Sequence, residues 1–144
     1  GFANFPDLNK FYFSNKKKTY LVENKKKRSI KSSKKKNLKG TKIAINTINT
    51  IKIKKIYNFF KNYKGIFKIT GCDAYNFCLV AEGKIDALIE SGLKKVDILP
   101  LVSILDNSGA IITNWKGKRS FSDGKILVSG NKTLHKKLLK IVRI

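Results

Sequence analysis

Three carboxylates stand at junctions between predicted elements, where side chains meet a cleft rather than a core. Asp73 opens a helix, Glu90 closes a strand, and Asp97 opens the next helix. Carboxylates gathered in a cleft can bind a cation. Helix N-termini also favour carboxylates as caps, and capping is the better interpretation of Asp73 or Asp97 taken singly.

The sequence offers few other candidates for catalysis or for metal and phosphate binding. The single histidine, His135, stands among lysines in the last predicted helix, so we expect it at the surface and no Ser–His–Asp triad. The two cysteines, Cys72 and Cys78, are too few for a disulfide scaffold or a zinc site, and we expect both to pack. No glycine-rich phosphate loop of the P-loop kind occurs.

Hydrophobic periodicity places these residues in an α/β fold that begins with a β-rich segment. Short extended runs separated by basic turns predict strands between Phe11 and Asn46. The later part alternates helices and strands, which indicates a layered arrangement. The expected helices are 49–63 (ended by Gly65), 73–82, 97–108 and 131–142 (capped by Asn131), and the expected strands are 66–69, 85–90, 110–114 and 125–129.

The net charge of +23 lies mostly in residues 1–70 and comes from 29 Lys and only 3 Arg. The abundance of Lys, Ile and Asn indicates a coding sequence rich in A and T, and Arg is the residue favoured for phosphate and base contacts. We therefore expect the lysine clusters 16–18, 25–28 and 34–36 to be solvated turns. A nucleic-acid partner is not expected; a non-catalytic RNA-binding module is the alternative from another class.

Length and the ends of the chain set further expectations. With 144 residues there is room for one domain, and no apolar run is long enough to cross a bilayer, so no membrane contact is expected. The sequence opens on Gly1 without a signal peptide and contains no Met. We therefore expect a cytoplasmic protein and a chain that was processed or cut at its N-terminus.

The stretch from Gly71 to Trp115 resembles the C-terminal half of the inositol monophosphatase superfamily of magnesium-dependent phosphatases. In that superfamily a Gly heads a helix that ends in an apolar "VA-G", and an Asp-containing strand then closes on a Glu. The metal-binding Asp follows that Glu after seven residues. This chain keeps that spacing at Glu90 and Asp97, with Gly71, Gly83 and Asp86 in register.

Within the superfamily the chain is most similar to the histidinol-phosphate phosphatases. Asp73, "GLK" at 92–94 and "ITNW" at 112–115 resemble that branch, whereas plain inositol monophosphatases usually carry Ser-Ala-Ala where this chain has Cys72, Asp73 and Ala74. On this resemblance, residues 1–64 are mid-chain strands and a helix of the phosphatase fold. Residues 65–144 are its C-terminal α/β subdomain.

The resemblance implies a layered αβαβα phosphomonoesterase that uses Mg²⁺ to activate water. By position, Asp97 would be a metal ligand, and Gly71, Asp73 and Glu90 would contact the non-phosphate part of the substrate. Histidinol phosphate carries an amine and an imidazole, for which two carboxylates are apt partners. Inositol 1-phosphate or another sugar phosphate is the alternative small phosphate monoester, and the resemblance also makes a homodimer plausible.

One part of the superfamily pattern has no counterpart here. Its main metal site uses an earlier Glu and an Asp-Pro-(Ile/Leu)-Asp-Gly-Thr run, yet the acidic residues before Asp73 are only Asp7 and Glu23. A single Asp cannot hold Mg²⁺, which prefers six oxygen ligands. We therefore expect the distal part of a longer enzyme, catalytically incomplete by itself.

Overall fold

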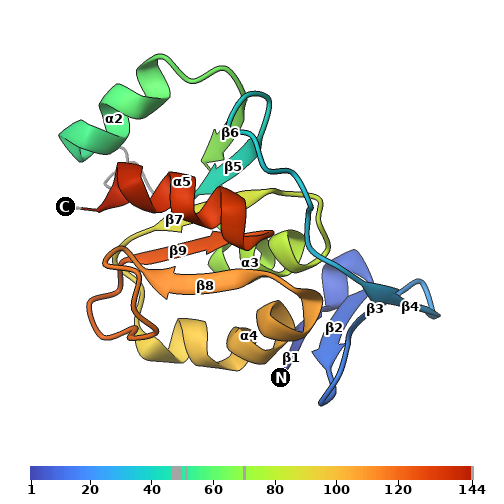
Figure 1. Cartoon of the computed structure of the whole chain (residues 1–144). Helices are drawn as coiled ribbons and strands as arrows, with labels where there is room; N and C mark the ends of the chain where they lie inside the picture. Colours follow the sequence, from blue (N-terminus) through green and yellow to red (C-terminus); the bar gives the residue numbers. More distant parts are fainter. Residues whose placement is uncertain (47–49, 51, 70, 144) are drawn as a thin grey trace.

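The computed structural model describes residues 1–46, 50, 52–69 and 71–143, whose strands form two separate sheets (Figure 1). The first sheet is an antiparallel meander in which a short 3-10 turn, η1, joins β1 to β2. Its elements are β1 (Phe2–Phe5), η1 (Pro6–Leu8), β2 (Lys10–Ser14), β3 (Thr19–Glu23) and β4 (Lys26–Ile30).

The second sheet has the order β6-β5-β7-β9-β8, with β6, β5 and β7 parallel and β9 antiparallel to both of its neighbours. Its strands are β5 (Lys42–Ile45), β6 (Ile66–Ile69), β7 (Ala87–Glu90), β8 (Ile111–Asn114) and β9 (Ile126–Ser129). The helices are α2 (Lys54–Lys61), α3 (Asp73–Ala81), α4 (Lys95–Ser108) and α5 (Lys132–Val142). The chain is therefore of mixed α/β class, as predicted.

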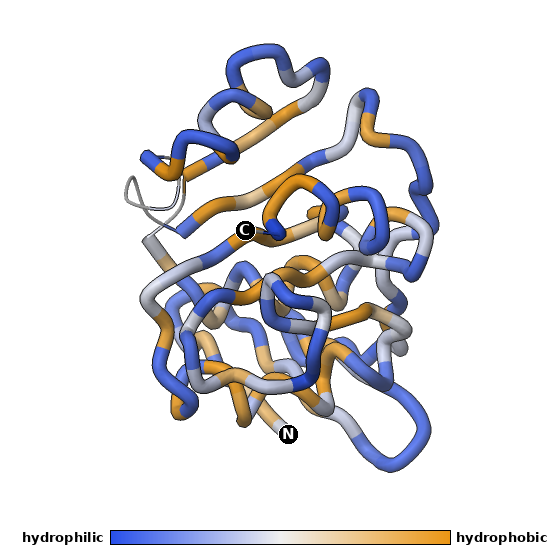
Figure 2. The backbone as a smooth tube through the Cα atoms, turned by 60° about the vertical axis from the view of Figure 1, so that its left-hand side comes forward, coloured by the Kyte–Doolittle hydropathy of each residue, from blue (hydrophilic) through white to orange (hydrophobic). Residues whose placement is uncertain are grey.

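Helices cover both faces of the second sheet, and α3 and α4 lie between the two sheets (Figure 1). Successive residues of β5 point to opposite faces, so Ala44 packs towards α3 and α4 while Ile43 and Ile45 pack towards α2 and α5. Strands buried on both faces are continuously apolar, which explains the runs KIAI and ALIE. Figure 2 shows the hydrophobic segments gathered in the interior of the molecule.

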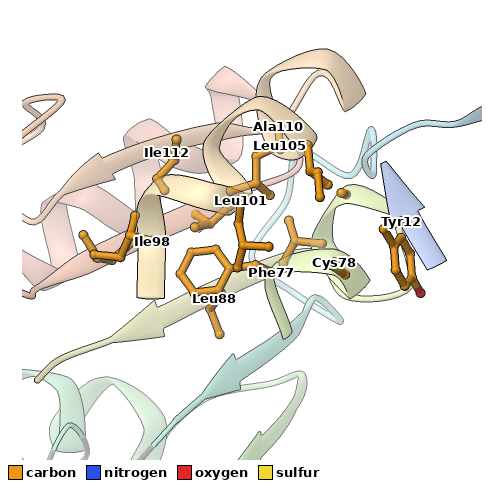
Figure 3. Close-up of a cluster of buried hydrophobic side chains, with 14 of the residues drawn as sticks. Tyr12, Phe77, Cys78, Leu88, Ile98, Leu101, Leu105, Ala110 and Ile112 are labelled. Atoms are coloured by element: carbon orange, nitrogen blue, oxygen red, sulfur yellow. The ribbon is translucent and has the colours of Figure 1, made fainter. Parts of the chain in front are cut away.

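The core between the sheets is built mainly by α3 and α4 (Figure 3). Phe77 of α3 and Leu101 of α4 pack with Leu88 of β7, and Tyr12 reaches this cluster from the first sheet. Burying one large apolar side chain contributes about 1.5–3 kcal/mol. This shared core fixes the ends of α3 and α4, and therefore the places of Asp73 and Asp97.

The outer face of the first sheet carries a row of aromatic rings. Phe11 and Phe13 stack with centroids 5.5 Å apart, and Phe13 and Tyr20 stack at 5.2 Å. The Lys27 ammonium lies over this row, 4.7 Å from the centre of the Tyr20 ring. A cation over aromatic faces is favourable, so the lysine partly screens these rings from water.

Residues 31–41 connect the sheets and are held by hydrogen bonds along their path. The Asp86 carboxylate accepts one from the Lys42 backbone N–H at 2.7 Å and another from the Ser33 hydroxyl. The Ser32 hydroxyl donates to the carbonyl of Gly130 at 2.7 Å. At Gly83 and Gly130 the linker backbone passes so close that a Cβ would lie 2.9 Å from the Lys31 carbonyl and 2.5 Å from that of Ser33.

Most of the predicted elements are confirmed, with boundaries shifted by one to a few residues. Asn131 caps α5 as predicted, since its side chain accepts a 3.0 Å hydrogen bond from the Leu134 N–H. Helix α2 ends at Lys61 with Asn62 as its C-cap, before Gly65, and the predicted start at Asn49 lies outside the described residues. The first sheet ends with β4 and the second begins with β5. Strand β5 and helix α2 therefore belong to the same layers as the later elements.

The expectation that both cysteines pack holds for Cys78 but is wrong for Cys72, which is exposed. Two expectations about polar residues are also wrong. His135 is 5% exposed rather than at the surface, because its ring fits between the Ser129 and Thr113 hydroxyls at 2.9 Å from each. In the cluster 25–28 only Lys25 lies in the turn, while the following residues belong to β4, a strand whose side chains are mostly exposed. In the described part of the chain, no helix has the length and apolarity needed to cross a membrane.

Candidate functional site

The three predicted carboxylates meet at one edge of the second sheet. Glu90 is the last residue of β7, Asp73 is the first of α3, and Asp97 lies in the first turn of α4. Their charges interact, because the negative charges of Asp73 and Asp97 both raise the pKa of Glu90. The carboxyl ends of parallel strands are where ligands bind in open α/β sheets, so this edge is the candidate site.

Glu90 is fully buried. The pKa of its carboxyl is raised to about 9, above all by burial and then by the charge of Asp73, while the nearby Asn76 amide opposes the rise. Among the described residues, neither Glu90 oxygen has a hydrogen-bond partner, and neither does Nδ2 of Asn76. Glu90 is therefore neutral at pH 7, and a cation placed beside it would favour release of its proton.

Asp73 is half-buried beside Glu90. Burial and the charge of Asp97 raise the pKa of Asp73, and a hydrogen bond with the Asn46 amide lowers it. Asn46 follows β5 and is itself fixed, because its Nδ2 donates to the Ser91 carbonyl at 3.1 Å. The Thr50 and Ser91 hydroxyls share a 2.6 Å hydrogen bond next to it. The polar wall of the site is thus preorganised around Asn46.

Asp97 is exposed, and its Oδ2 accepts a 2.8 Å hydrogen bond from the backbone N–H of Lys94. The interpretation of Asp97 as a helix cap is therefore confirmed. Asp73 differs: the N-cap of α3 is Cys72, and no side-chain hydrogen bond caps that helix. Asp73 thus has no capping role.

Gly71 lies in the exposed loop between β6 and α3. A Cβ built on it would meet no described atom within 4 Å apart from its chain neighbours. Nothing in the described structure therefore requires glycine at this position, although the loop brings it next to Asp73.

The described residues do not by themselves form a magnesium site. No three or more His, Cys, Asp or Glu side chains among them are grouped so that they could hold a metal ion. Asp97 can offer one carboxylate, already partly engaged as a cap, whereas Mg²⁺ prefers six oxygen ligands in an octahedron. No metal-dependent step is therefore assigned to these residues.

Sequence reasoning missed three polar residues of the site: Asn46, Asn76 and Ser91. Asn46 and Ser91 each follow a buried strand, and the pairing of Ile45 with Ile89 brings them together. A parallel pairing of KIAI with ALIE could have revealed them. Asn76 could have been found as a polar residue, 1% exposed, on the otherwise apolar inner face of α3.

Solved structures described as inositol monophosphatases share this fold. The structure superimposes on the Thermotoga maritima IMPase with a TM-score of 0.79 and 20% identity, covering 95% of this chain and 52% of that one. A Pyrococcus horikoshii protein described as similar to inositol-1 monophosphatase gives a TM-score of 0.75 at 21% identity, covering 97% and 55%. These likenesses establish the fold, and they show that the chain spans about half of each structure.

The curated relatives align with a smaller part of this chain than the solved structures do. The chain is 35% identical over 79 residues to the Arabidopsis thaliana "Bifunctional phosphatase IMPL2, chloroplastic", covering 49% of this chain and 23% of that protein. It is 26% identical over 70 residues to the Chlorobaculum parvum histidinol-phosphatase, covering 49% and 27%. It is 33% identical over 89 residues to an Aquifex aeolicus fructose-1,6-bisphosphatase/inositol-1-monophosphatase, covering 60% and 33%.

The aligned segments thus amount to a quarter to a third of the relatives' own lengths. The relatives are phosphatases of different substrates, and enzymes of this kind use divalent metal ions. The family model named Inositol monophosphatase family matches residues 1–144. Fold and family model agree, and the chain belongs to the inositol monophosphatase family.

Proposed function

We propose that this chain forms the substrate-recognition side of a phosphomonoesterase that hydrolyses histidinol phosphate to histidinol and phosphate. The observation that carries the proposal is the pair Glu90 and Asp73: a buried carboxyl that has no hydrogen-bond partner among the described residues lies beside a second, half-buried carboxylate. Two acidic groups at one place suit a substrate that carries positive charge.

Charge balance distinguishes the two substrate classes. A bound amine or imidazolium would stabilise the ionised form of Glu90, so binding would release a proton near pH 7. Inositol phosphate and other sugar phosphates, the alternative substrates, offer hydroxyl groups to this end of the site and leave Glu90 protonated. The relative named histidinol-phosphatase supports the first class, and those named for inositol and fructose phosphates support the second.

We further propose that Asp97 is one ligand of a Mg²⁺ site completed by groups beyond these 144 residues. The described carboxylates are too few to hold the ion, so the chain alone should release no phosphate from histidinol phosphate in the presence of Mg²⁺. Turnover by the chain alone would overturn this part, and Asp97→Asn would then show whether Asp97 takes part. Because both cysteines are free, we place the protein in the cytoplasm.

The first test measures binding of histidinol, the non-phosphate part of the substrate, by calorimetry at pH 7. Titrations in two buffers with different ionisation enthalpies report the protons released. We expect histidinol to bind more tightly than inositol and to release protons, and Asp73→Asn to weaken histidinol binding about tenfold. Asp123→Asn removes an exposed carboxylate in the β8–β9 connection and is the matched control.

Two outcomes would overturn the substrate assignment. One is equal affinity for histidinol and inositol without proton release. The other is an equal effect of Asp73→Asn on both ligands, which would make Asp73 a structural residue rather than a charge partner.

A further inference from the structure

A cavity of about 530 Å³ lies between the β5–β6 edge of the second sheet and the flank of α3. Its floor includes Ala44 and Ile66, and its walls include Tyr75, Leu79 and Ile85. This volume lies within the range of small-molecule pockets, and the exposed lining is mostly apolar. The cavity is therefore large enough, and of the right character, to hold a small apolar body.

The cavity exists because α3 does not extend over β6. Helix α3 packs on α4, β7 and β9 and leaves the four residues of the edge strand β6 exposed, while Ala44 of β5 stays buried. Ile66 is 51% exposed at this edge, although it is a large apolar residue. The pocket reaches from Gly71 to Lys42 at the amino end of β5, away from Glu90 at the carboxyl edge of the sheet. It lies beside the candidate site, which it adjoins at Gly71 and Asn76.

Lysines line this apolar cavity. Lys42 pairs with Ile66 and Ala44 with Lys68, so both lysines lie on the same face of the sheet as the two apolar floor residues. A third, Lys84, is paired with Glu82 at 3.0 Å, whereas no described carboxylate forms an ion pair with Lys42 or Lys68. None of the described lining residues is acidic. The cavity therefore combines an apolar floor with two exposed lysines that form no ion pair in the described structure.

Asn76 lies where the cavity meets the candidate site: it lines the cavity and is 1% exposed, and its amide also lowers the pKa of Glu90. Its Nδ2 has no hydrogen-bond partner among the described residues. Asn76 therefore belongs to both places and does not by itself select a ligand for the cavity.

We propose that this pocket binds a small amphipathic anion, an apolar chain or ring that ends in a carboxylate, phosphate or sulfate. The apolar part lies on Ala44, Ile66 and Leu79, and the anionic group pairs with Lys42 and Lys68. Charge complementarity selects an anion over a cation, and the largely apolar lining selects an amphipathic molecule over a sugar.

The test uses decanoate on the 144-residue chain, below its micelle concentration, with decanol and decyltrimethylammonium as ligands of matched chain length. Calorimetry gives the affinity, and the alkylation rate of Cys72 gives a site-specific readout. Cys72 lines the cavity and is exposed, whereas Cys78, the other cysteine, is fully buried. We expect decanoate to bind at least tenfold more tightly than either comparison ligand and to slow the alkylation of Cys72.

Variants identify the contacts. Lys68→Glu should weaken decanoate binding at least tenfold, and Leu79→Trp should fill the cavity and abolish protection of Cys72. Lys132→Glu changes an exposed lysine on α5 by the same charge and should leave binding unchanged. Asp73→Asn should also leave it unchanged, which separates this pocket from the proposed substrate site.

Several results would overturn the proposal. Equal binding of decanoate and decanol would show that charge is not recognised, and equal effects of Lys68→Glu and Lys132→Glu would show attraction to the overall positive charge alone. A dimer in sedimentation that protects Cys72 without any ligand would assign the cavity to contact with a second copy instead.

Discussion

The Tyr12 hydroxyl donates a 2.8 Å hydrogen bond to the Glu82 carboxylate and so ties the first sheet to the end of α3. Glu82 is also paired with Arg28 of β4 and with Lys84 at 3.0 Å, and its side chain is almost fully buried. Burial raises the pKa of Glu82, but hydrogen bonds from Lys84 and Tyr12 outweigh it and hold that pKa below its ordinary value. The contact joins two layers through one buried, compensated charge.

Tyr12→Phe should lower the free energy of unfolding by about 1–2 kcal/mol, because the buried Glu82 carboxylate loses a hydrogen-bond donor. Tyr57→Phe removes a hydroxyl from an exposed ring on α2 and should change it by less than about 0.5 kcal/mol. Urea denaturation of both variants, followed by circular dichroism, measures the difference. Equal stability of Tyr12→Phe and the parent chain would show that the bond contributes nothing net.

Glu90 should make the protein less stable as pH rises from 7 to 9. Its folded-state pKa of about 9 exceeds its ordinary value of 4.5, so between these values the folded state binds more protons than the unfolded state. The contribution to the slope is at most about 1.4 kcal/mol per pH unit. Glu90→Gln should remove this slope, and denaturation curves at several pH values between 7 and 9 measure it. The same slope in parent and variant would exclude Glu90 as its source.

His135 should have the opposite effect at lower pH. Burial lowers the pKa of His135 from 6.5 to about 4, so between these values the unfolded state binds more protons. Its contribution to stability is therefore lost progressively as pH falls from 6.5 to 4. The difference in unfolding free energy between the parent chain and His135→Gln should shrink over that interval. Lys136→Gln, on the exposed face of the same helix, should show a constant difference.

Gly130→Ala should destabilise the chain by about 1–3 kcal/mol, because the new Cβ would lie 2.5 Å from the Ser33 carbonyl oxygen and 2.8 Å from the Ser33 nitrogen. Both are backbone atoms that cannot rotate away. Gly71→Ala is the control: no described atom other than its chain neighbours lies within 4 Å of the new Cβ, and we expect no loss of stability. Melting temperatures by calorimetry compare the two, and similar values would show that the linker can shift freely.

The elements of this fold were predictable where local signals agree. Asn131 precedes an amphipathic run and caps α5, and the apolar runs KIAI and ALIE form strands buried on both faces. The sequence order of Asp73, Glu90 and Asp97 predicted a shared site edge, because each stands at a junction that the sheet brings together.

Long-range neighbours were not predictable from local pattern. His135 stands among lysines in sequence, yet its burial depends on Ser129 and Thr113 in two other strands. Asn46 and Asn76 enter the site only through the pairing of β5 with β7 and the placement of α3. The assignment of β5 to the second sheet likewise depends on partners far along the chain.

The close passage of residues 31–41 over Gly83 and Gly130 has a mechanical consequence. Hydrogen bonds of Ser32, Ser33 and Lys42 hold the linker against Gly130 and Asp86, next to strands of the second sheet. The Tyr12 hydroxyl binds the first sheet to Glu82. The two sheets are thus held to each other at the linker and at Tyr12. If Glu90 recognises the substrate as proposed, it would do so from a preformed template rather than through closure of one layer against the other.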